Sequence, residues 1–186
     1  MNLVQKSKKV KKVNQMGIDI NSKFDNKIQE LEKELPYLKN DVNCAELTLT
    51  NVLDVLEIDN YIFHNIAKPL AGGFGGYKSK KGWMGACGAV VGGCAAIGAI
   101  LGGQEKMDEE TMFTAYLKAR EFASEFEKEF GSVVCSELCG FDFSDPNGYM
   151  NYRESGTWEK TCYKFVIWAL DKVRKMTIED LKKKWE

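Results

Sequence analysis

The run from Gly82 to Gln104 constrains the fold of this chain more than any other feature. Its 23 residues carry no charge, and seven of the twenty residues from Met84 to Gly103 are glycine. About 20 apolar residues suffice to span a bilayer, but Ile, Leu and Val are few here, so transfer of the run into lipid is weakly favourable. Small residues also let helices pack closely. We therefore expect a buried central helix and no transmembrane span.

Helical periodicity is found on both sides of this run. Apolar residues recur at helical spacing in residues 22–39, 43–58, 60–71, 108–130 and 157–176, and short helices are expected after Ser132 and Thr177. Ser22 and Asp25 are candidate caps for the first helix, and Asn43 with Glu46 forms a capping-box pattern for the second. Residues 72–76 and 141–156 are expected to be loops. The sequence predicts an all-α fold, a compact multi-helix bundle around the central Gly/Ala-rich helix.

Charge and the N-terminal residues limit the compartment and the partners. Five lysines and no acid occur in the first twelve residues, with no apolar signal-peptide core after them. We expect a cytoplasmic protein in which residues 1–20 are a basic flexible tail and residues 21–186 form one helical domain. A net charge of −1 gives no reason to expect a nucleic-acid partner. The aromatic residues Trp158, Phe165 and Trp168 indicate either core or the contact face of a homo-oligomer.

The six cysteines carry the strongest chemical signal. No two of them are spaced as CxxC, and the chain has a single histidine, His64. A thioredoxin motif, a zinc ribbon and a Cys/His zinc finger therefore have no support from spacing. His64 could activate a cysteine as a general base, but a lone histidine is more often packed or at the surface.

Four of the cysteines fall near predicted helix starts, and these are Cys44, Cys87, Cys135 and Cys162. Unpaired N–H groups and the helix dipole stabilise a thiolate there. Three lysines, Lys78, Lys80 and Lys81, precede Cys87 and would add to this effect. The thiolate is both the nucleophile and the metal ligand. We expect lowered thiol pKa values at these positions.

Cys94 and Cys139 carry a weaker signal. Cys94 follows Cys87 by seven residues and Cys139 follows Cys135 by four, so each shares a helical face with its predecessor. On an ideal helix these spacings are ~10 Å and ~6 Å, which suit neighbouring ligands better than direct disulfides. Core packing is the expectation for both.

Taken together, the ordered cysteines and glycines resemble the C_GCAxxG_C_C family of redox-active proteins. The similarity covers roughly residues 40–175. It rests on Asn43-Cys44-Ala45, on Ala71 to Gly76, on Cys87-Gly88-Ala89-Val90-Val91-Gly92, on Phe130-Gly131-Ser132 before Cys135, and on Cys162. The four characteristic cysteines of the family correspond to Cys44, Cys87, Cys135 and Cys162. Cys94, Cys139 and the basic N-terminal extension lie outside the pattern.

The resemblance implies redox chemistry, in an oxidoreductase or an electron-transfer protein with a redox partner protein. The four cysteines are expected either to cycle between dithiol and disulfide, with Cys44 or Cys87 attacking first, or to ligate an iron–sulfur cluster or another metal. They are therefore candidate catalytic residues and candidate metal ligands. Gly88 and Gly92 would let a backbone or a cofactor approach the sulfur of Cys87, and so are candidate cofactor-binding residues.

Two readings from other classes remain open at this point. One is a structural or adaptor bundle with a zinc–cysteine site and no turnover, which would lose structure on chelation. The other is a small membrane-associated subunit that uses the uncharged run at residues 82–104.

Overall fold

A computed structural model describes residues 19–38, 43–58 and 61–186. Of the predicted tail, residues 1–20, positions 1–18 lie outside the described residues. The helices are α1 (Ile20–Glu34), α2 (Cys44–Val55), α3 (Tyr61–Leu70), α4 (Gly88–Gly102), α5 (Glu109–Phe130), α6 (Cys135–Cys139), α7 (Gly148–Glu154), α8 (Tyr163–Met176) and α9 (Ile178–Trp185). A 3-10 turn, η1 (Leu35–Tyr37), and two π-helical turns, η2 (Ala71–Gly75) and η3 (Trp158–Cys162), complete the described elements. The described residues contain no β-strand, so the all-α prediction is confirmed.

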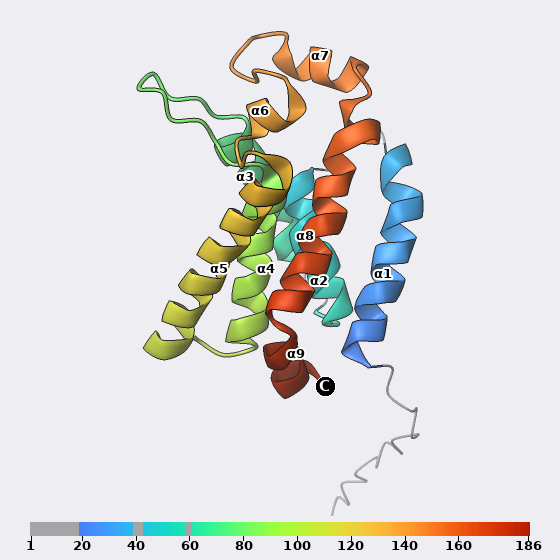
Figure 1. Cartoon of the computed structure of the whole chain (residues 1–186), viewed down its shortest axis with the longest axis vertical. Coiled ribbons are helices and arrows are strands. Elements are labelled where there is room, and N and C mark those ends of the chain that lie inside the picture. The colour runs from blue at the N-terminus through green and yellow to red at the C-terminus, as the bar shows by residue number, and fades with distance from the viewer. Residues whose placement is uncertain (1–18, 39–42, 59–60) are drawn as a thin grey trace, which may run out of the picture.

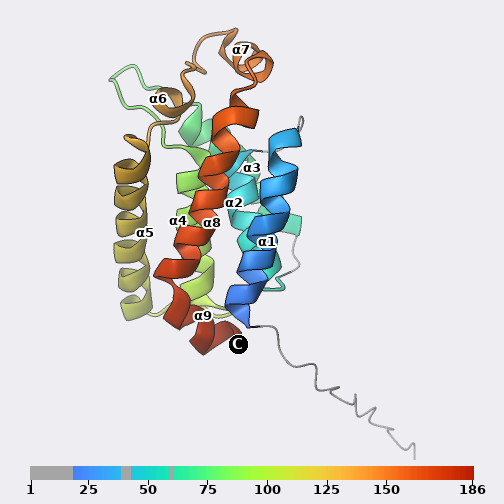
Figure 2. The same cartoon turned by 45° about the vertical axis from the view of Figure 1, so that its right-hand side comes forward.

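Helix α4 occupies the centre of the bundle, as the sequence predicts. It packs against α2, α5, α8 and α9, and Figures 1 and 2 show it between α5 on one side and α2 and α8 on the other. Its glycines make this possible. A Cβ on Gly92 would lie 2.5 Å from the Ala45 carbonyl oxygen, and one on Gly93 would lie 2.4 Å from the Phe122 ring. Helix α4 has 15 residues, and no helix in the described part of the chain is long and apolar enough to cross a membrane.

The helix caps predicted from the sequence are confirmed only in part. The Asn43 side chain accepts a hydrogen bond from the Glu46 N–H at 2.9 Å, as predicted. The Glu46 carboxylate does not complete the capping box, because its Oε1 lies 3.1 Å from His64 Nδ1. The Ser22/Asp25 cap is wrong: α1 begins at Ile20, which is buried, and has no side-chain cap.

Both predicted loops contain helical turns. Residues 71–75 form η2, closed by a hydrogen bond from the Gly76 N–H to the Ala71 carbonyl at 3.0 Å. Pro69 lies two residues earlier, and a proline inside a helix removes a donor and displaces a carbonyl, which favours a widened turn. The stretch 141–156 contains α7, whose N-terminal glycine, Gly148, is buried.

Helix α5 buries only part of its apolar residues. Ala115, Phe122 and Phe126 of α5 are buried, but Met112 and Tyr116 near its start are exposed. Helix α5 extends along one side of the bundle (Figure 2), and its buried residues begin in its second turn.

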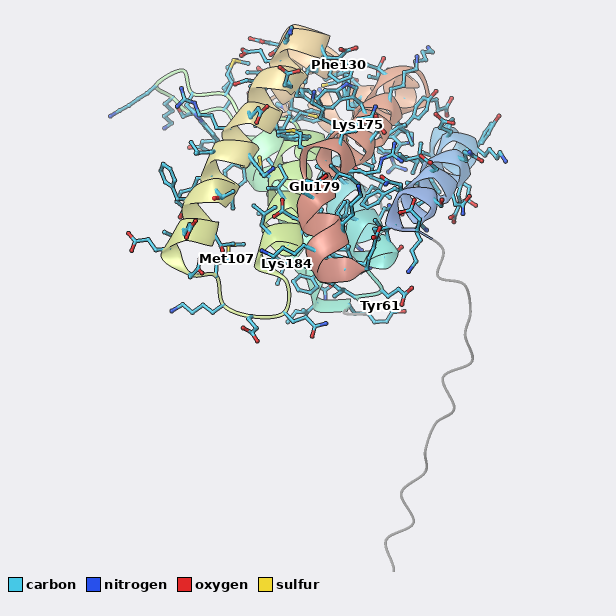
Figure 3. All side chains as sticks on the ribbon, turned by 60° about the horizontal axis from the view of Figure 1, so that its bottom comes forward. Tyr61, Met107, Phe130, Lys175, Glu179 and Lys184 are labelled. Atoms are coloured by element: carbon cyan, nitrogen blue, oxygen red, sulfur yellow. The ribbon has the colours of Figure 1, made fainter. Side chains whose placement is uncertain are left out.

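Helix α9 covers one end of the bundle. The Trp185 indole N–H donates to the Ile100 carbonyl at 3.1 Å, and the Lys184 ammonium donates to the Leu101 carbonyl. These bonds hold α9 against the last turn of α4, at the end that faces the viewer in Figure 3. Helices α6 and α7 lie at the opposite end (Figure 1), where the N-terminal turns of α2 and α4 also begin.

Candidate functional site: a cavity lined by five cysteines

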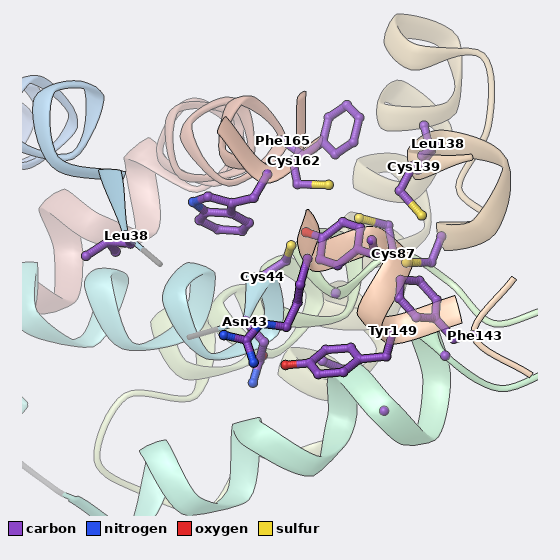
Figure 4. A pocket seen from close by; sticks show the side chains of 18 of the residues that line it. Leu38, Asn43, Cys44, Cys87, Leu138, Cys139, Phe143, Tyr149, Cys162 and Phe165 are labelled. Atoms are coloured by element: carbon purple, nitrogen blue, oxygen red, sulfur yellow. The ribbon is translucent and has the colours of Figure 1, made fainter. Parts of the chain in front are cut away.

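A cavity of about 1080 Å³ lies at the end of the bundle that carries α6 and α7. Five of the six cysteines line it, namely Cys44, Cys87, Cys135, Cys139 and Cys162. In Figure 4 the sulfurs of Cys44, Cys87, Cys139 and Cys162 approach a common space from different elements. The four cysteines predicted from the sequence are thus brought together. Cys94 is not among the lining residues, and its thiol lies 3.8 Å from the Ala119 carbonyl in the contact between α4 and α5.

Glycine brings the first turns of α2 and α4 together. A Cβ on Gly88 would lie 3.0 Å from the Cβ of Cys44 and 2.9 Å from the Ala45 nitrogen. Beside Gly92, Ala45 and Thr48 fill the equivalent space. The sequence predicts that a backbone or a cofactor comes close to Cys87 at these glycines. The backbone of α2 does so. Gly88 also lines the cavity, and its contact with a cofactor stays a prediction.

A short antiparallel bridge fixes the starts of α4 and α6 relative to each other. Ala86 pairs with Val134, the Cys87 N–H donates to the Val133 carbonyl at 2.7 Å, and the Cys135 N–H donates to the Gly85 carbonyl at 3.0 Å. These bonds hold two cysteines 48 positions apart in sequence at one wall of the cavity.

Cys44 and Cys87 form a hydrogen-bonded pair across the contact between α2 and α4. The Cys44 thiol donates to the Cys87 sulfur, which raises the pKa of Cys44 well above its ordinary value, and burial raises it further. The same bond lowers the pKa of Cys87, and the N–H groups of Ala89 and Val90 add to this effect. Of the two thiols, Cys87 at the N-cap of α4 is therefore the one that ionises more readily.

Cys135 and Cys139 form a second pair within α6. The Cys135 thiol donates to the Cys139 sulfur, and this bond together with burial raises the pKa of Cys135. It lowers the pKa of Cys139 to about 7, with help from the Phe141 N–H. The Cys139 thiol, when protonated, donates to the Phe141 carbonyl oxygen at 3.8 Å. The sequence-based expectation of core packing at Cys139 missed this role, although the four-residue spacing already placed both cysteines on one helical face.

Cys162, at the end of η3, has a different partner. Burial raises the pKa of its thiol to about 12, although a hydrogen bond with the Tyr152 hydroxyl acts in the opposite direction. Burial, followed by the charge of Cys162, raises the pKa of Tyr152 itself. Tyr152 lies in α7, inside the stretch expected to be a loop, and no sequence pattern indicated it.

The helix-start argument for acidity is thus right for Cys87 and wrong for Cys44, Cys135 and Cys162. The two donors of the sulfur–sulfur bonds and the buried Cys162 have raised pKa values because bonding and burial outweigh the helix dipole. The lysine argument is also wrong. Lys78, Lys80 and Lys81 are exposed and do not line the cavity, and the Lys78 ammonium lies 2.8 Å from the Asp142 carboxylate.

Polar groups lie at the rim of the cavity. Asn43 and Lys68 line it from α2 and α3, and the Asn43 amide donates to the Lys68 carbonyl at 3.3 Å. Arg153 of α7 lies 6.0 Å from the centroid of the exposed Tyr149 ring. His64 does not line the cavity, and its bond to Glu46 places it in the contact between α2 and α3.

The donor set suits soft metals, but its spacing does not suit an ion. Thiolates are the ligands of zinc and of iron–sulfur clusters. Within residues 19–38, 43–58 and 61–186, however, no three side chains of His, Cys, Asp or Glu are placed so that they could hold a metal ion. The sulfurs are instead grouped as two hydrogen-bonded pairs and one tyrosine-bonded thiol.

Comparison with known proteins agrees with this sulfur-lined site. No curated protein and no solved structure matches the chain. One family model matches residues 42–176, and its description is "Putative redox-active protein (C_GCAxxG_C_C)". The matched range includes all the cysteines of the cavity and the glycines that bring α2 against α4. This chain therefore belongs to the C_GCAxxG_C_C family of redox-active proteins.

Proposed function

We propose that this protein is a thiol–disulfide redox protein whose working pair is Cys44 and Cys87. The observation that carries the proposal is the hydrogen bond from the Cys44 thiol to the Cys87 sulfur, at the junction of α2 and α4 inside the cavity. One sulfur of a redox pair must be available as a thiolate and the other must be close enough to resolve the intermediate. The pairing favours both conditions, because it lowers the pKa of Cys87 and keeps the Cys44 sulfur beside it.

The reaction is a two-electron exchange with a disulfide of a small molecule or of a redox partner protein. The Cys87 thiolate attacks one sulfur of the substrate, the substrate S–S bond breaks, and one substrate thiolate leaves. Cys44 then attacks the Cys87 sulfur of the mixed disulfide and expels the second substrate thiolate. The dithiol loses two electrons and the substrate gains them. One released thiolate takes the proton of Cys44, and the other takes a proton from solvent, which replaces the one that Cys87 gave up on ionising.

The size and position of the cavity support this chemistry. Its volume of about 1080 Å³ is just above the ~300–1,000 Å³ range of small-molecule sites. Tyr149, at its rim, is exposed, so a substrate can approach from solvent.

Oxidation of the reduced protein by a small disulfide, followed by peptide mapping, tests the proposal. We expect a Cys44–Cys87 disulfide in the wild type and in Cys94→Ser, because Cys94 lies outside the cavity. Cys87→Ser should not form this link. Metal analysis and an absorption spectrum of protein purified without oxygen come first. Iron or zinc bound in stoichiometric amount through Cys44 and Cys87, or the absence of any Cys44–Cys87 link after oxidation, would overturn the proposal.

A further inference from the structure

One cysteine of the second pair lies outside the four that the sequence resemblance assigns to the family pattern. The resemblance assigns Cys44, Cys87, Cys135 and Cys162, whereas five cysteines line the cavity, and the fifth is Cys139. Its sulfur accepts a hydrogen bond from Cys135, so the arrangement at Cys44 and Cys87 is repeated on the facing element. Both residues of this second pair line the same cavity as the first.

We propose that Cys135 and Cys139 form a second redox dithiol, so that the reduced site holds four electrons in two dithiols and gives them up as two disulfides form. The inference builds on the proposed thiol–disulfide function and adds a further nucleophile, Cys139, to it. Cys162 is not part of either disulfide, because its sulfur has a different partner and is hydrogen-bonded to the Tyr152 hydroxyl.

The geometry of α6 allows the second disulfide. Residues four apart on a helix have Cα atoms ~6 Å apart, within the ~4.4–6.8 Å that a disulfide spans, but their Cβ atoms are ~5–6 Å apart and must approach to ~4 Å. A long helix would resist this change. Helix α6 has only five residues, and it ends at Gly140 in the left-handed region with φ +77°, with open space around it. The turn can tighten at its C-terminal end.

The start of α6 stays fixed while its end adjusts. The Cys135 N–H is bonded to the Gly85 carbonyl, and a Cβ on Gly75 of η2 would lie 3.5 Å from the Cys135 sulfur. Cys135 is therefore held in place, and Cys139 is the member of the pair that moves. The movement brings the Cys139 sulfur toward a fixed partner.

The proposed step is balanced for a low-molecular-weight disulfide as oxidant. The Cys139 thiolate attacks one substrate sulfur, the substrate S–S bond breaks, and one thiolate leaves. Cys135 then attacks the Cys139 sulfur of the mixed disulfide and releases the second thiolate. Two electrons pass from the dithiol to the substrate. One released thiolate takes the proton of Cys135 and the other takes a proton from solvent, so the products are a Cys135–Cys139 disulfide and two thiols.

Thiol counting with peptide mapping tests the inference. The fully reduced chain has six free thiols, and saturating oxidised glutathione should remove four of them and leave Cys94 and Cys162. The mapped links should be Cys44–Cys87 and Cys135–Cys139. Cys139→Ser should lose two thiols out of five. The matched control, Cys94→Ser, should lose four thiols out of five, because Cys94 lies between α4 and α5 and belongs to neither pair.

The outcomes separate this inference from the proposed function. Loss of two thiols with a Cys44–Cys87 link alone would overturn the second dithiol and leave the proposed function standing. A Cys135–Cys139 link alone would support the second dithiol and overturn the assignment of the working pair. A link from Cys139 to Cys87 or to Cys162 would also overturn the inference. The wild-type map decides the question even where Cys139→Ser does not fold.

Discussion

At the scale of single residues, the neighbouring sulfur determines the acidity of each cysteine more than its place in a helix does. Cys44 and Cys87 both lie at helix starts, yet their pKa values shift in opposite directions because one thiol donates to the other. Cys139 lies at the end of α6, where the helix dipole disfavours a thiolate, and its pKa is still lowered to about 7.

Removal of the Cys135 donor should therefore make Cys139 less reactive near neutral pH. The thiolate is the reactive form, so a pKa of about 7 keeps Cys139 half ionised at pH 7. Without the donor, burial dominates and the pKa rises. In Cys135→Ala we expect alkylation of Cys139 at pH 7 to slow by roughly tenfold or more, given an ordinary pKa of ≈ 8.5. Peptide-resolved alkylation rates between pH 5 and 10 measure the change.

A matched variant makes this prediction specific. Cys94→Ser removes a thiol whose pKa is raised by burial and which lies outside the cavity, so it should leave the Cys139 profile unchanged. Equal profiles in Cys135→Ala and the wild type would show that the sulfur–sulfur hydrogen bond does not control the acidity of Cys139.

Some features of single residues at the site can be predicted from the sequence, and others cannot. Asn43 is recognisable as a helix cap from its own type and that of Glu46, so the position of Cys44 in a first turn is predictable. The partner of Cys44 is not. The contact with Cys87 depends on the packing of α2 on α4, and the contact of Cys162 with Tyr152 depends on a helix turn in an expected loop.

At the scale of elements, the glycines of α4 are of two kinds. At some of them a Cβ would collide with a neighbouring element, and at others there is room for a Cβ. A Cβ on Gly92 would lie 2.5 Å from the Ala45 carbonyl, whereas one on Gly98 would meet only the Met107 methyl at 4.0 Å. We expect Gly92→Ala to lower the free energy of unfolding by about 1–3 kcal/mol. Gly98→Ala should raise it by up to about 1 kcal/mol through helix propensity.

Urea unfolding of the two variants side by side measures this contrast. Gly92→Ala should also slow oxidation of the Cys44–Cys87 pair, because it pushes α2 away from α4 next to the site. Gly98→Ala should oxidise at the wild-type rate. Two variants of equal stability would mean that the close contact between α2 and α4 does not govern packing at this interface.

The central position of α4 is predictable for a physical reason that does not apply to the turns. A helix without any polar face must be covered on all sides, so the composition of residues 82–104 alone requires a core position. The π-helical turns η2 and η3 have no such signature. The Trp158 indole of η3 donates to the Leu35 carbonyl at 2.7 Å, a contact between residues 123 positions apart that no local pattern contains.

At the scale of the whole molecule, the proposed disulfide would link two helices that are distant in sequence. Cys44 and Cys87 are 43 positions apart, and closing a loop of this length in the unfolded chain stabilises the fold by roughly 4 kcal/mol in the chain-entropy model. The oxidised wild type should therefore need more urea to unfold than the reduced protein. Cys87→Ser should show no such dependence on this link.

Stability and redox potential are connected by a thermodynamic cycle. Its four states are the folded and the unfolded protein, each with the Cys44–Cys87 pair reduced or oxidised. If oxidation stabilises the fold by roughly 4 kcal/mol, folding must stabilise the Cys44–Cys87 disulfide by the same amount. For a two-electron couple this makes the potential of the folded protein about 90 mV more negative than that of the unfolded chain. Equilibration with glutathione buffers, with and without urea, measures the difference directly. A folded potential equal to or above the unfolded one would show that the bundle strains the disulfide, and the pair would then act as an oxidant.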